Sequence, residues 1–557
     1  MKTLPPKTLT PVRQKLLPVG RALAGAVLAA LLLAGLAAGQ SSQFPSDAAP
    51  EVSELLRHGQ QLEVERRWGD ALSHYEEAVR KFPDDRGLQG HFDNARLHYD
   101  LERRYDDRSY RELLDRLSLE EALDVYSEVL LKIEAHYVEI PNWKELVERG
   151  TNMLEVALSE SAFLRRNAPN ATDGALDDFR YRLRRELGSR VIQSRVNARD
   201  AVASAAATAH ARLGVPPRAV VLEYTCGAAN TLDLYSAYLT PDQLTDVFSQ
   251  IEGNFVGLGV ELKADEGALW IVRVISGSPA ERSGIRADDR IVNVDGQSTR
   301  ELSTDQAANL LQGEAGSVVE LSVVSPGAPP RQVRIRRERV EVPSVDEVKL
   351  LDDGPGVGYL KITCFQKTTT RDLDAALWDL HRAGMKSLIV DVRGNPGGLL
   401  VTAVEVADKF VNHGVIVSTR GRSLEEDFTY SAHPLGTWRV PLVVLIDHES
   451  ASAAEIFAGA IRHHRRGTVI GTRSYGKGSV QGIFPLSQTG AGVRLTTSKF
   501  YSPSGRPYGH VGVEPDIVVQ HVARPIDGSG DLASAAGGED PVLAAALQAA
   551  ERVVAQR

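Results

Sequence analysis

Three patterns of hydrophobic and polar residues follow one another along the chain. From residue 51 to about 210, apolar residues recur every three or four positions between charged ones, which predicts amphipathic helices. From about 250 to 340, β-branched and polar residues alternate between glycine and aspartate turns, which predicts short strands. After 340, apolar runs such as "KSLIVDVR" (386–393) and "VPLVVLID" (440–447) alternate with helical segments, which predicts a layered α/β core. We therefore expect a multidomain α+β protein.

These patterns divide the chain into segments of different character. A chain of 557 residues is too long for a single hydrophobic core, so several domains are expected. The segments are a leader at 1–39, a linker at 40–50, a first helical region at 51–117, a helical domain at 118–245 with a solvated insertion at 165–215, a β-rich domain at 246–340, an α/β core at 341–522, and a tail with a short helix at 523–557.

The leader has the pattern of an export signal. Basic residues between Lys2 and Arg21 precede an uncharged apolar run from Ala22 to Gly39. The run ends in small residues that suit a cleavage site, and it is also long enough to span a bilayer as an uncleaved anchor. We therefore expect an exported protein of the periplasm or cell envelope, with residues 22–39 either removed or anchoring it in the inner membrane.

The first helical region carries the spacing of one tetratricopeptide repeat. Small and aromatic residues occupy the positions where two helices of such a repeat cross, and a proline follows the second helix. These residues are Gly59, Ala71, Tyr75, Ala78 and Pro83. The pattern predicts either a tetratricopeptide-like docking unit for a partner protein or a plain helical hairpin.

Composition removes some classes of function. The chain has 43% hydrophobic and 25% charged residues and a net charge of −9, so nucleic acid is not an expected partner. The two cysteines, Cys226 and Cys364, lie outside any metal-binding spacing and are predicted to be structural. Accordingly, neither a metal nor another cofactor is expected.

The β-rich region contains a glycine loop suited to binding an anion. In "NFVGLGVEL" the loop Gly257-Leu258-Gly259 follows Phe255, and glycines there let backbone N–H groups approach a ligand closely. Together with "SPAERSG" (278–284) and "DDRIVNVDG" (288–296), this segment resembles a PDZ domain. The resemblance implies that the loop and Phe255 receive the C-terminus of a peptide, which adds as a strand to the neighbouring edge.

The candidate chemistry begins in "DHESASAAEIFAGAIRHH" (447–464). Ser450 and Ser452 precede a small-residue run that predicts a helix, and histidines stand on both sides. Neither serine lies in a GxSxG elbow, and no histidine stands in a recognisable partner motif, so a histidine-assisted triad is unsupported. Lys477 in "RSYGKGSVQ" is the better proton acceptor, because a desolvated lysine becomes a neutral amine.

Donors for an oxyanion can come from two backbone positions. The glycine-rich turn "DVRGNPGG" (391–398) closes a predicted strand and can aim the N–H of Gly398 at a developing negative charge. The second candidate is the N–H of Ala453, at the positive end of the predicted helix. Each of these motifs alone is commonly a turn or a helix cap. Their order behind a peptide-binding domain is what indicates catalysis.

The motifs together resemble those of the carboxy-terminal processing peptidases, also called tail-specific proteases. The resemblance rests on "ESASAAEIFAGAI", "GTRSYGKGSVQ", "DVRGNPGG" and "KFYSPSGRPYGHVGVEPDI". It implies Ser452 as the nucleophile, Lys477 as the general base and Gln481 as the residue that orients the lysine, with Gly398 and Ala453 as oxyanion donors. It also implies a core like those of the crotonases and the ClpP peptidase.

The sequence departs from this family at several places. In "LDLYSAYLTPDQ", Leu234 and Tyr235 replace the usual proline and histidine, a change expected to leave the catalytic residues untouched. Gln312 stands where many relatives carry an arginine thought to couple peptide binding to activation, so activity here is expected to be switched differently. The tetratricopeptide-like portion and the 165–215 insertion lie outside the usual architecture.

The sequence thus predicts an exported serine endopeptidase. It would capture protein or peptide substrates by a free, apolar C-terminus and cleave them through an acyl-enzyme. An inactive envelope scaffold, with helical repeats and a PDZ groove binding partners, is the alternative. A crotonase-like enzyme acting on acyl thioesters would share the layered fold by analogy only and would have no use for a PDZ domain.

Overall fold

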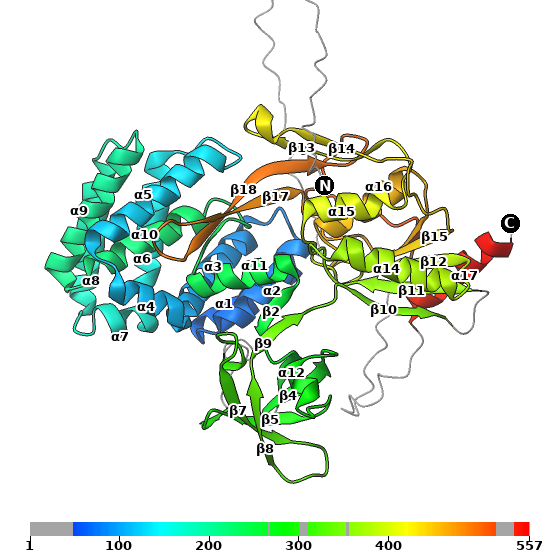
Figure 1. Ribbon diagram of the computed structural model, residues 1–557. Coiled ribbons are helices and arrows are strands. Elements are labelled where there is room, and N and C mark those ends of the chain that lie inside the picture. Colours follow the sequence, from blue (N-terminus) through cyan, green and yellow to red (C-terminus); the bar gives the residue numbers. More distant parts are fainter. Residues whose placement is uncertain (1–47, 266–267, 301–309, 352–355, 520–539, 556–557) are drawn as a thin grey trace, which may run out of the picture.

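The computed structural model describes residues 48–265, 268–300, 310–351, 356–519 and 540–555 (Figure 1). The leader at 1–39 and most of the linker at 40–50 lie outside these ranges, so the expectations for them stay predictions. Within the ranges described, none of the helices combines the length and the apolar character needed to cross a membrane.

Helices make up the first part of the described chain. They are α1 (Ala48–Val64), α2 (Trp68–Lys81), α3 (Arg86–Asp106), α4 (Arg108–Arg116), α5 (Leu119–His136), α6 (Trp143–Ala157), α7 (Ser161–Asn167), α8 (Asp173–Gly188), α9 (Arg195–Leu213) and α10 (Pro217–Asn230). Polar caps fix where several of them begin. At α5, Ser118 Oγ accepts from Glu121 N–H (3.2 Å) and the Glu121 carboxylate accepts from Ser118 N–H (2.8 Å), a reciprocal capping box. The helices from α4 to α10 share one hydrophobic core.

The crossing of α1 and α2 shows why small residues recur in the first helical region. A Cβ on Gly59 would come within 2.2 Å of the Tyr75 ring, so only glycine lets the two helices approach this closely. Ala71, Tyr75 and Ala78 are buried in the cluster between α1, α2 and α3. The predicted helical hairpin is therefore present.

The expectation of a solvated insertion at 165–215 is wrong. Helix α9 packs against α5, α6, α8 and α10, and Ala201, Val202 and Ala205 are fully buried. Alanines give a weak apolar signal in a sequence, yet their small volume suits the narrow space between closely packed helices. The segment is part of the helical core.

The β-rich domain lies at the bottom of Figure 1. It contains β2 (Asn254–Gly257), β3 (Val260–Asp265), β4 (Ala268–Val274), α12 (Pro279–Arg282), β5 (Arg290–Val294), β6 (Gln297–Ser298), β7 (Val318–Val324), β8 (Arg331–Arg336) and β9 (Glu338–Glu341). Strands β3-β4-β5-β7-β8 form an antiparallel sheet with β3 at one edge, and the β2–β9 ribbon joins it to the rest of the chain. The expected boundary between 245 and 246 falls inside α11 (Pro241–Glu252).

The α/β core is a sheet with helices on both faces (Figure 1). Its strands, in spatial order, are β10 (Val345–Leu350), β11 (Val357–Ile362), β12 (Ser387–Asp391), β15 (Leu442–Ile446), β16 (Thr468–Gly471) and β19 (Ile517–Val518). All neighbours are parallel except β10 and β11. Helices α14 (Thr369–Arg382), α15 (Leu400–Asp408) and α16 (Ala453–His463) cover one face, and α17 (Pro541–Ala555) covers the other. The predicted strands at 386–393 and 440–447 and the short tail helix are confirmed.

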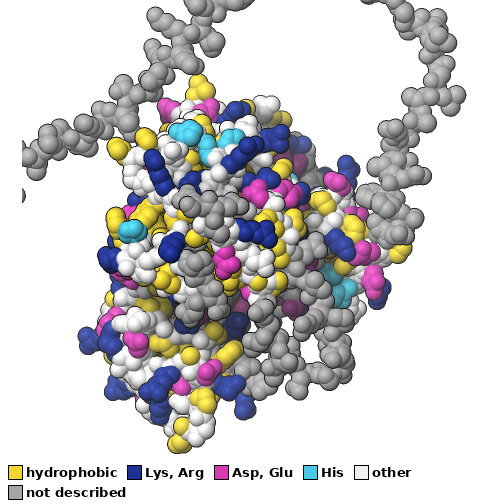
Figure 2. All heavy atoms as spheres, turned by 90° about the vertical axis from the view of Figure 1, so that its right-hand side faces the viewer, with side chains coloured by type: hydrophobic (Ala, Val, Ile, Leu, Met, Phe, Trp, Pro, Cys, Tyr) yellow, Lys and Arg dark blue, Asp and Glu magenta, His cyan; other side chains and the backbone are white. Residues whose placement is uncertain are grey.

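A second sheet connects the core with the helical domain. It is built from β1 (Ala237–Leu239), β13 (Val415–Gly421), β14 (Phe428–Ser431), β17 (Ser479–Pro485) and β18 (Gly492–Tyr501), with the short helix η1 (Leu424–Glu426) beside it. Strand β18 pairs with β1 near its start and with β13 near its end. Figure 2 shows the side of the molecule that carries α17, where positive and negative side chains are interspersed with hydrophobic ones.

Candidate active site

The candidate site lies where two central strands of the core end. Strands β12 and β15 are parallel neighbours, so the loops that leave their carboxyl ends, 392–399 and 447–452, lie side by side. This end of a parallel sheet is the usual position for ligands in α/β folds, because loops and helix N-termini converge there. The sequence motifs "DVRGNPGG" and "DHESAS" therefore meet in space.

Asn395 joins the two loops. Its side chain is fully buried, with Nδ2 donating to Ile362 O (2.8 Å) and Oδ1 accepting from Gly397 N–H (2.8 Å). Its carbonyl accepts from Ala451 N–H (2.9 Å). One buried amide thus fixes the glycine turn to the end of β11 and to the segment that carries the serines.

Ser452 occupies a strained turn immediately before α16. Its φ of +55° and ψ of −111° match the first central position of a type II′ turn, which glycine normally fills. Such a conformation costs about 1–3 kcal/mol and persists only where surrounding contacts hold it. A Cβ on Gly397 would come within 2.8 Å of Ser452 Cβ and 3.1 Å of Ala453 N, so the glycine turn lies directly against the serine.

Ser450 has a structural environment instead. It is fully buried, and its Oγ donates to Val392 O (2.8 Å) and accepts from Asp447 N–H (2.9 Å). The Asp447 carboxylate in turn accepts from Gly394 N–H (3.0 Å) and Ser450 N–H (2.9 Å). Ser450 and Asp447 therefore fasten the two loops together.

Two backbone N–H groups in the adjoining loops, those of Gly398 and Ala453, remain available. Across the ranges that the structure describes, neither Gly398 N–H nor Ala453 N–H donates a hydrogen bond, and Ala453 is the first residue of α16. The N-terminal N–H groups of a helix carry partial positive charge. The pair is thus suited to receiving an oxyanion.

Lys477 lies on the loop between β16 and β17, with its side chain largely enclosed. Burial is the main cause that lowers the pKa of its ammonium group to about 8; nearby Arg494 lowers it further, while Glu455 and Asp233 act in the opposite direction. A Cβ on Gly478 would come within 2.2 Å of Gly509 N, so glycine is required where this loop meets its neighbour. About a tenth of the lysine is therefore neutral amine at pH 7 and about half at pH 8.

Glu455 is the residue that sequence reasoning missed. It is fully buried on the first turn of α16, and its Oε2 accepts from both Ser452 N–H (2.7 Å) and Lys477 N–H (2.9 Å). Its Oε1 accepts from Ser474 Oγ (2.6 Å) and Gly476 N–H (2.7 Å). Burial raises the pKa of Glu455, an effect that these hydrogen bonds oppose. One carboxylate thus fixes the serine turn and the lysine loop relative to each other.

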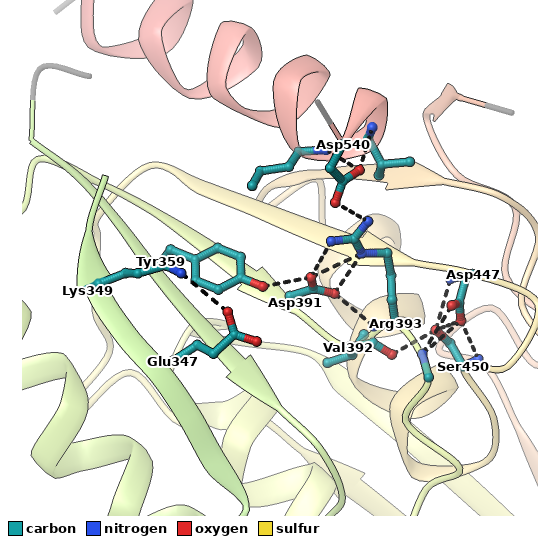
Figure 3. A network of polar contacts seen from close by, with 12 residues as sticks. Glu347, Lys349, Tyr359, Asp391, Val392, Arg393, Asp447, Ser450 and Asp540 are labelled. Carbon is teal, nitrogen blue, oxygen red and sulfur yellow. Dashed lines mark hydrogen bonds and ion pairs between the residues drawn. The ribbon is translucent and has the colours of Figure 1, made fainter. Parts of the chain in front are cut away.

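A second polar network supports the glycine turn from behind (Figure 3). Asp391, at the end of β12, accepts from Tyr359 Oη (2.9 Å) and from the guanidinium of Arg393 (2.6 Å at the closest). Arg393 also donates to Asp540 Oδ2 (2.8 Å), and Asp540 Oδ1 caps α17 by accepting from Leu543 N–H (3.1 Å). The C-terminal helix is therefore tied to the loop that presents Gly398.

Gln481 lies on β17 and is engaged with its neighbours. Its Nε2 donates to Ser479 Oγ (2.9 Å) and to Thr496 Oγ1 (3.5 Å). No hydrogen bond links its side chain to Lys477 in the part of the chain that the structure describes. The assignment of an orienting role to Gln481 stays a prediction.

Tyr235 is closer to the site than expected. The centre of its ring lies 4.7 Å from Lys477 Nζ, within the range of a cation–π contact. The change from proline-histidine to Leu234-Tyr235 thus brings a side chain against Lys477. Whether it affects catalysis stays a prediction. The sequence could not reveal this contact, because β1, which follows Tyr235, and β17, which follows Lys477, meet only through their pairing with β18 in the tertiary structure.

The glycine loop of the β-rich domain forms one wall of a separate pocket. This pocket, of about 190 Å³, is lined by Phe255, Gly257, Leu258, Gly259, Val260, Leu262, Leu311 and Gln312. Most of the lining is apolar. Over the described ranges, the N–H groups of Leu258 and Gly259 have no acceptor, and the neighbouring β3 is an edge strand. Gln312 lines the same pocket as the glycine loop.

The two cysteines, Cys226 and Cys364, are free, and Cys226 is buried. In the described segments, no group of three or more histidine, cysteine, aspartate or glutamate side chains is arranged to hold a metal ion.

Comparison with known families identifies the class of protein. Residues 356–519 match the model of peptidase family S41, and residues 270–325 match that of the PDZ domain. The fold, the site and these matches define a serine-type peptidase with a PDZ domain.

Characterised relatives narrow the identity further. The carboxy-terminal-processing protease of Bartonella bacilliformis is 39% identical over 301 residues, covering 53% of this chain and 68% of the relative. The carboxyl-terminal-processing protease of Synechocystis is 34% identical over 292 residues, covering 51% and 67%. The solved photosystem II D1 C-terminal processing protease aligns with 26% identity over 72% of this chain and 93% of that one, with a TM-score of 0.37. The chain belongs to the carboxy-terminal-processing proteases of family S41, and it is a serine endopeptidase rather than an inactive scaffold.

Proposed function

We propose that Ser452 is the nucleophile and Lys477 the general base of this endopeptidase. The neutral amine of Lys477 takes the proton of Ser452 Oγ while Oγ attacks the scissile carbonyl carbon. The N–H groups of Gly398 and Ala453 stabilise the resulting oxyanion. The Lys477 ammonium then gives its proton to the leaving amine, and water, deprotonated by the same lysine, hydrolyses the acyl-enzyme.

The observation that carries this proposal is the double hydrogen bond to Glu455 Oε2. It holds the backbones of Ser452 and Lys477 against one carboxylate oxygen, at 2.7 and 2.9 Å. The strained Ser452 turn and the lowered pKa of Lys477, about 8, support the same assignment. A base whose pKa lies near the working pH combines a sufficient neutral fraction with sufficient basicity.

Single substitutions test the two assignments. We expect Ser452→Ala and Lys477→Ala each to lower kcat/KM for a peptide substrate by more than about 10³-fold, as losses of nucleophile or base do in serine peptidases. Ser431→Ala and Lys386→Ala are matched controls, since both side chains are exposed and distant in the fold. Circular dichroism would check that all four variants fold. Substantial activity in either site variant would refute the proposal.

Gln481 enters this proposal in a smaller role. Its likeness to the family's orienting residue supports an effect on the direction of the Lys477 side chain. Since its amide is engaged with Ser479 and Thr496, Gln481→Ala should lower kcat less than Lys477→Ala does. A loss equal to that of Lys477→Ala would assign it a larger role than proposed here.

We further propose that the PDZ pocket receives the C-terminus of the substrate. The N–H groups of Leu258 and Gly259, which have no acceptor among the residues that the structure describes, suit a terminal carboxylate. The apolar lining that includes Phe255 and Leu262 suits an apolar last residue. Amidation of a substrate's C-terminus removes the charge and should raise KM about 10- to 100-fold with little change in kcat, since hydrogen bonds to charged groups contribute about 1.5–3 kcal/mol. An unchanged KM would contradict this binding mode.

Three further proposals concern the N-terminal helices, the type of core and the location of the protein. We infer that α1–α3 form a tetratricopeptide-like docking unit for a partner protein, an idea supported by the Gly59–Tyr75 crossing. The peptidase core is proposed to be crotonase- and ClpP-like, on the basis of its parallel strands with helices on both faces. Export to the periplasm or cell envelope, with residues 22–39 as signal or anchor, is supported by the charge pattern of the leader. Cell fractionation of the full chain and of a form lacking residues 2–39 tests the last of these.

A further inference from the structure

Tyr235 is held rigidly beside the proposed base. Its N–H donates to Asp233 Oδ1 (2.7 Å), and its carbonyl accepts from Arg494 Nε (2.8 Å). The next residue, Ser236, donates both its N–H (2.8 Å) and its Oγ (3.0 Å) to the Asp233 carboxylate. Because the backbone is fixed on both sides, the ring keeps its place against Lys477 at 4.7 Å from Nζ.

A second aromatic ring and the N-terminal helices complete this contact. The phenol of Tyr475 lies beside that of Tyr235. Burial is the main cause that raises the pKa of Tyr235, and the neighbouring Tyr475 raises it further. The guanidinium of Arg80, on α2, lies 5.2 Å from the centre of the Tyr475 ring. A chain of contacts thus runs from α2 through two aromatic rings to Lys477.

The charges around Lys477 explain what an aromatic face can contribute. Arg494, on β18, disfavours the ammonium form, as burial does. Glu455, on α16, and Asp233, in the loop before β1, favour it. The negative face of a tyrosine ring attracts a cation, and the attraction grows where water is excluded. The ring therefore interacts more strongly with the ammonium than with the neutral amine.

We propose that Tyr235 is a positioning residue for Lys477. The face of the Tyr235 ring holds the end of the lysine side chain and stabilises the ammonium that forms when Lys477 takes the proton of Ser452. The step moves one proton from Oγ to Nζ as the bond from Oγ to the carbonyl carbon forms. Tyr235 itself neither gains nor loses a proton. This inference rests on the proposed function of Ser452 and Lys477.

A pair of substitutions separates the ring face from the hydroxyl. Tyr235→Leu removes the face, and Tyr235→Phe keeps the face while losing the contact with Tyr475. For Tyr235→Leu we expect kcat to fall about tenfold and the acidic limb of the kcat/KM profile to move about one unit toward lower pH, because the ammonium loses a desolvated cation–π contact. Tyr235→Phe should keep the wild-type limb and stay within about threefold of wild-type kcat.

A measurement independent of activity completes the test. NMR titration of ¹⁵N-labelled lysine in Ser452→Ala protein, with Lys477→Ala for assignment, reports the pKa of Lys477 directly. The pKa should be about one unit lower with Tyr235→Leu than with Tyr235→Phe. Equal pKa values, or a Tyr235→Phe variant as impaired as Tyr235→Leu, would overturn the inference. If Lys477→Ala retained activity, the proposed mechanism would fall, whereas the titration would still test the contact.

Discussion

The active site and the PDZ pocket use opposite means to present backbone N–H groups. At the active site, buried polar side chains brace the backbone, with Asn395 and Glu455 each holding at least two segments. At the PDZ pocket, apolar side chains such as Leu258 and Leu311 shape the wall, and among the residues described no side chain hydrogen-bonds to the glycine loop 257–259. The one buried polar brace nearby, Arg337, holds the other wall by donating to Leu311 O (3.0 Å) and Leu310 O (2.8 Å). One chain therefore contains both a cross-braced site and a hydrophobically shaped one.

The difference fits the roles proposed above for the two sites. Catalysis needs reacting groups held within a fraction of an ångström, because small misplacements cost large factors in rate. Capture of a chain end needs one fixed anion contact and a tolerant apolar pocket. We therefore expect substitutions at the first site to change kcat and those at the second to change KM, and the predictions below test this division.

Beyond the proposed nucleophile and base themselves, the largest effect is expected at Glu455. In Glu455→Gln an amide NH₂ replaces one carboxylate oxygen. Depending on its orientation, either the Ser452 and Lys477 N–H groups or the Gly476 N–H and the Ser474 hydroxyl lose their acceptor, at about 1–3 kcal/mol for each buried unsatisfied group. We predict a loss of kcat of about 10³-fold, with KM changed less than about threefold. Steady-state kinetics measures both, and thermal unfolding reports the accompanying loss of stability.

The exposed neighbour Glu449 offers a matched control for this change. Glu449→Gln makes the same chemical substitution on the same loop and should leave kcat unchanged. If Glu455→Gln retained most of its kcat, a bracing role for the carboxylate would be untenable.

An intermediate effect is expected at the PDZ pocket. Leu262→Asp places a carboxylate in the pocket where the substrate's own carboxylate and apolar residue are proposed to bind. KM should rise about tenfold or more, with kcat at saturation unchanged, because like charges repel and apolar burial is lost. Lys263→Asp, on the opposite face of β3, is the control. A fall in kcat without a rise in KM would break the division between the two sites.

The smallest effect is expected at the C-terminal helix. Asp540→Asn keeps a side chain able to cap α17 but weakens the ion pair with Arg393, which is partly exposed. Since such pairs contribute about 1 kcal/mol or less, kcat should fall about two- to fivefold, with KM unchanged. Kinetics at low and high salt would check this, since the difference from wild type should shrink as salt screens the pair. A hundredfold loss would show that α17 does more than support the glycine turn.

The sequence allowed the main elements and the reactive residues to be nominated. Continuous apolar runs at 386–393 and 440–447 predict strands of a layered α/β core, and the structure has β12 and β15 there. Glu455 carries a partial signal, because a glutamate three residues after a serine is typical of a capping box. Its bond to Lys477 N–H has no such signal, since it depends on how a distant loop returns to the helix.

Other features escaped prediction for related reasons. The alanine-rich α9 was assigned to solvent because small residues contribute little to a periodic pattern, although close helix packing favours them. Tyr235 and Asp540 act across 242 and 147 positions of sequence, respectively, so only tertiary structure reveals their partners Lys477 and Arg393. Local sequence patterns predict helices and strands, whereas contacts between residues far apart in the sequence are revealed only by the tertiary structure.

The pH dependence of kcat/KM tests the central claim most directly. A lysine base works only as the neutral amine, so activity should be low below its pKa and rise as the pH increases through it. Because burial lowers the pKa of Lys477 to about 8, the rising limb should have its midpoint near that value for a substrate without titrating groups in this range. A midpoint at about 6.5, the ordinary pKa of histidine, would contradict the assignment of Lys477 as the base.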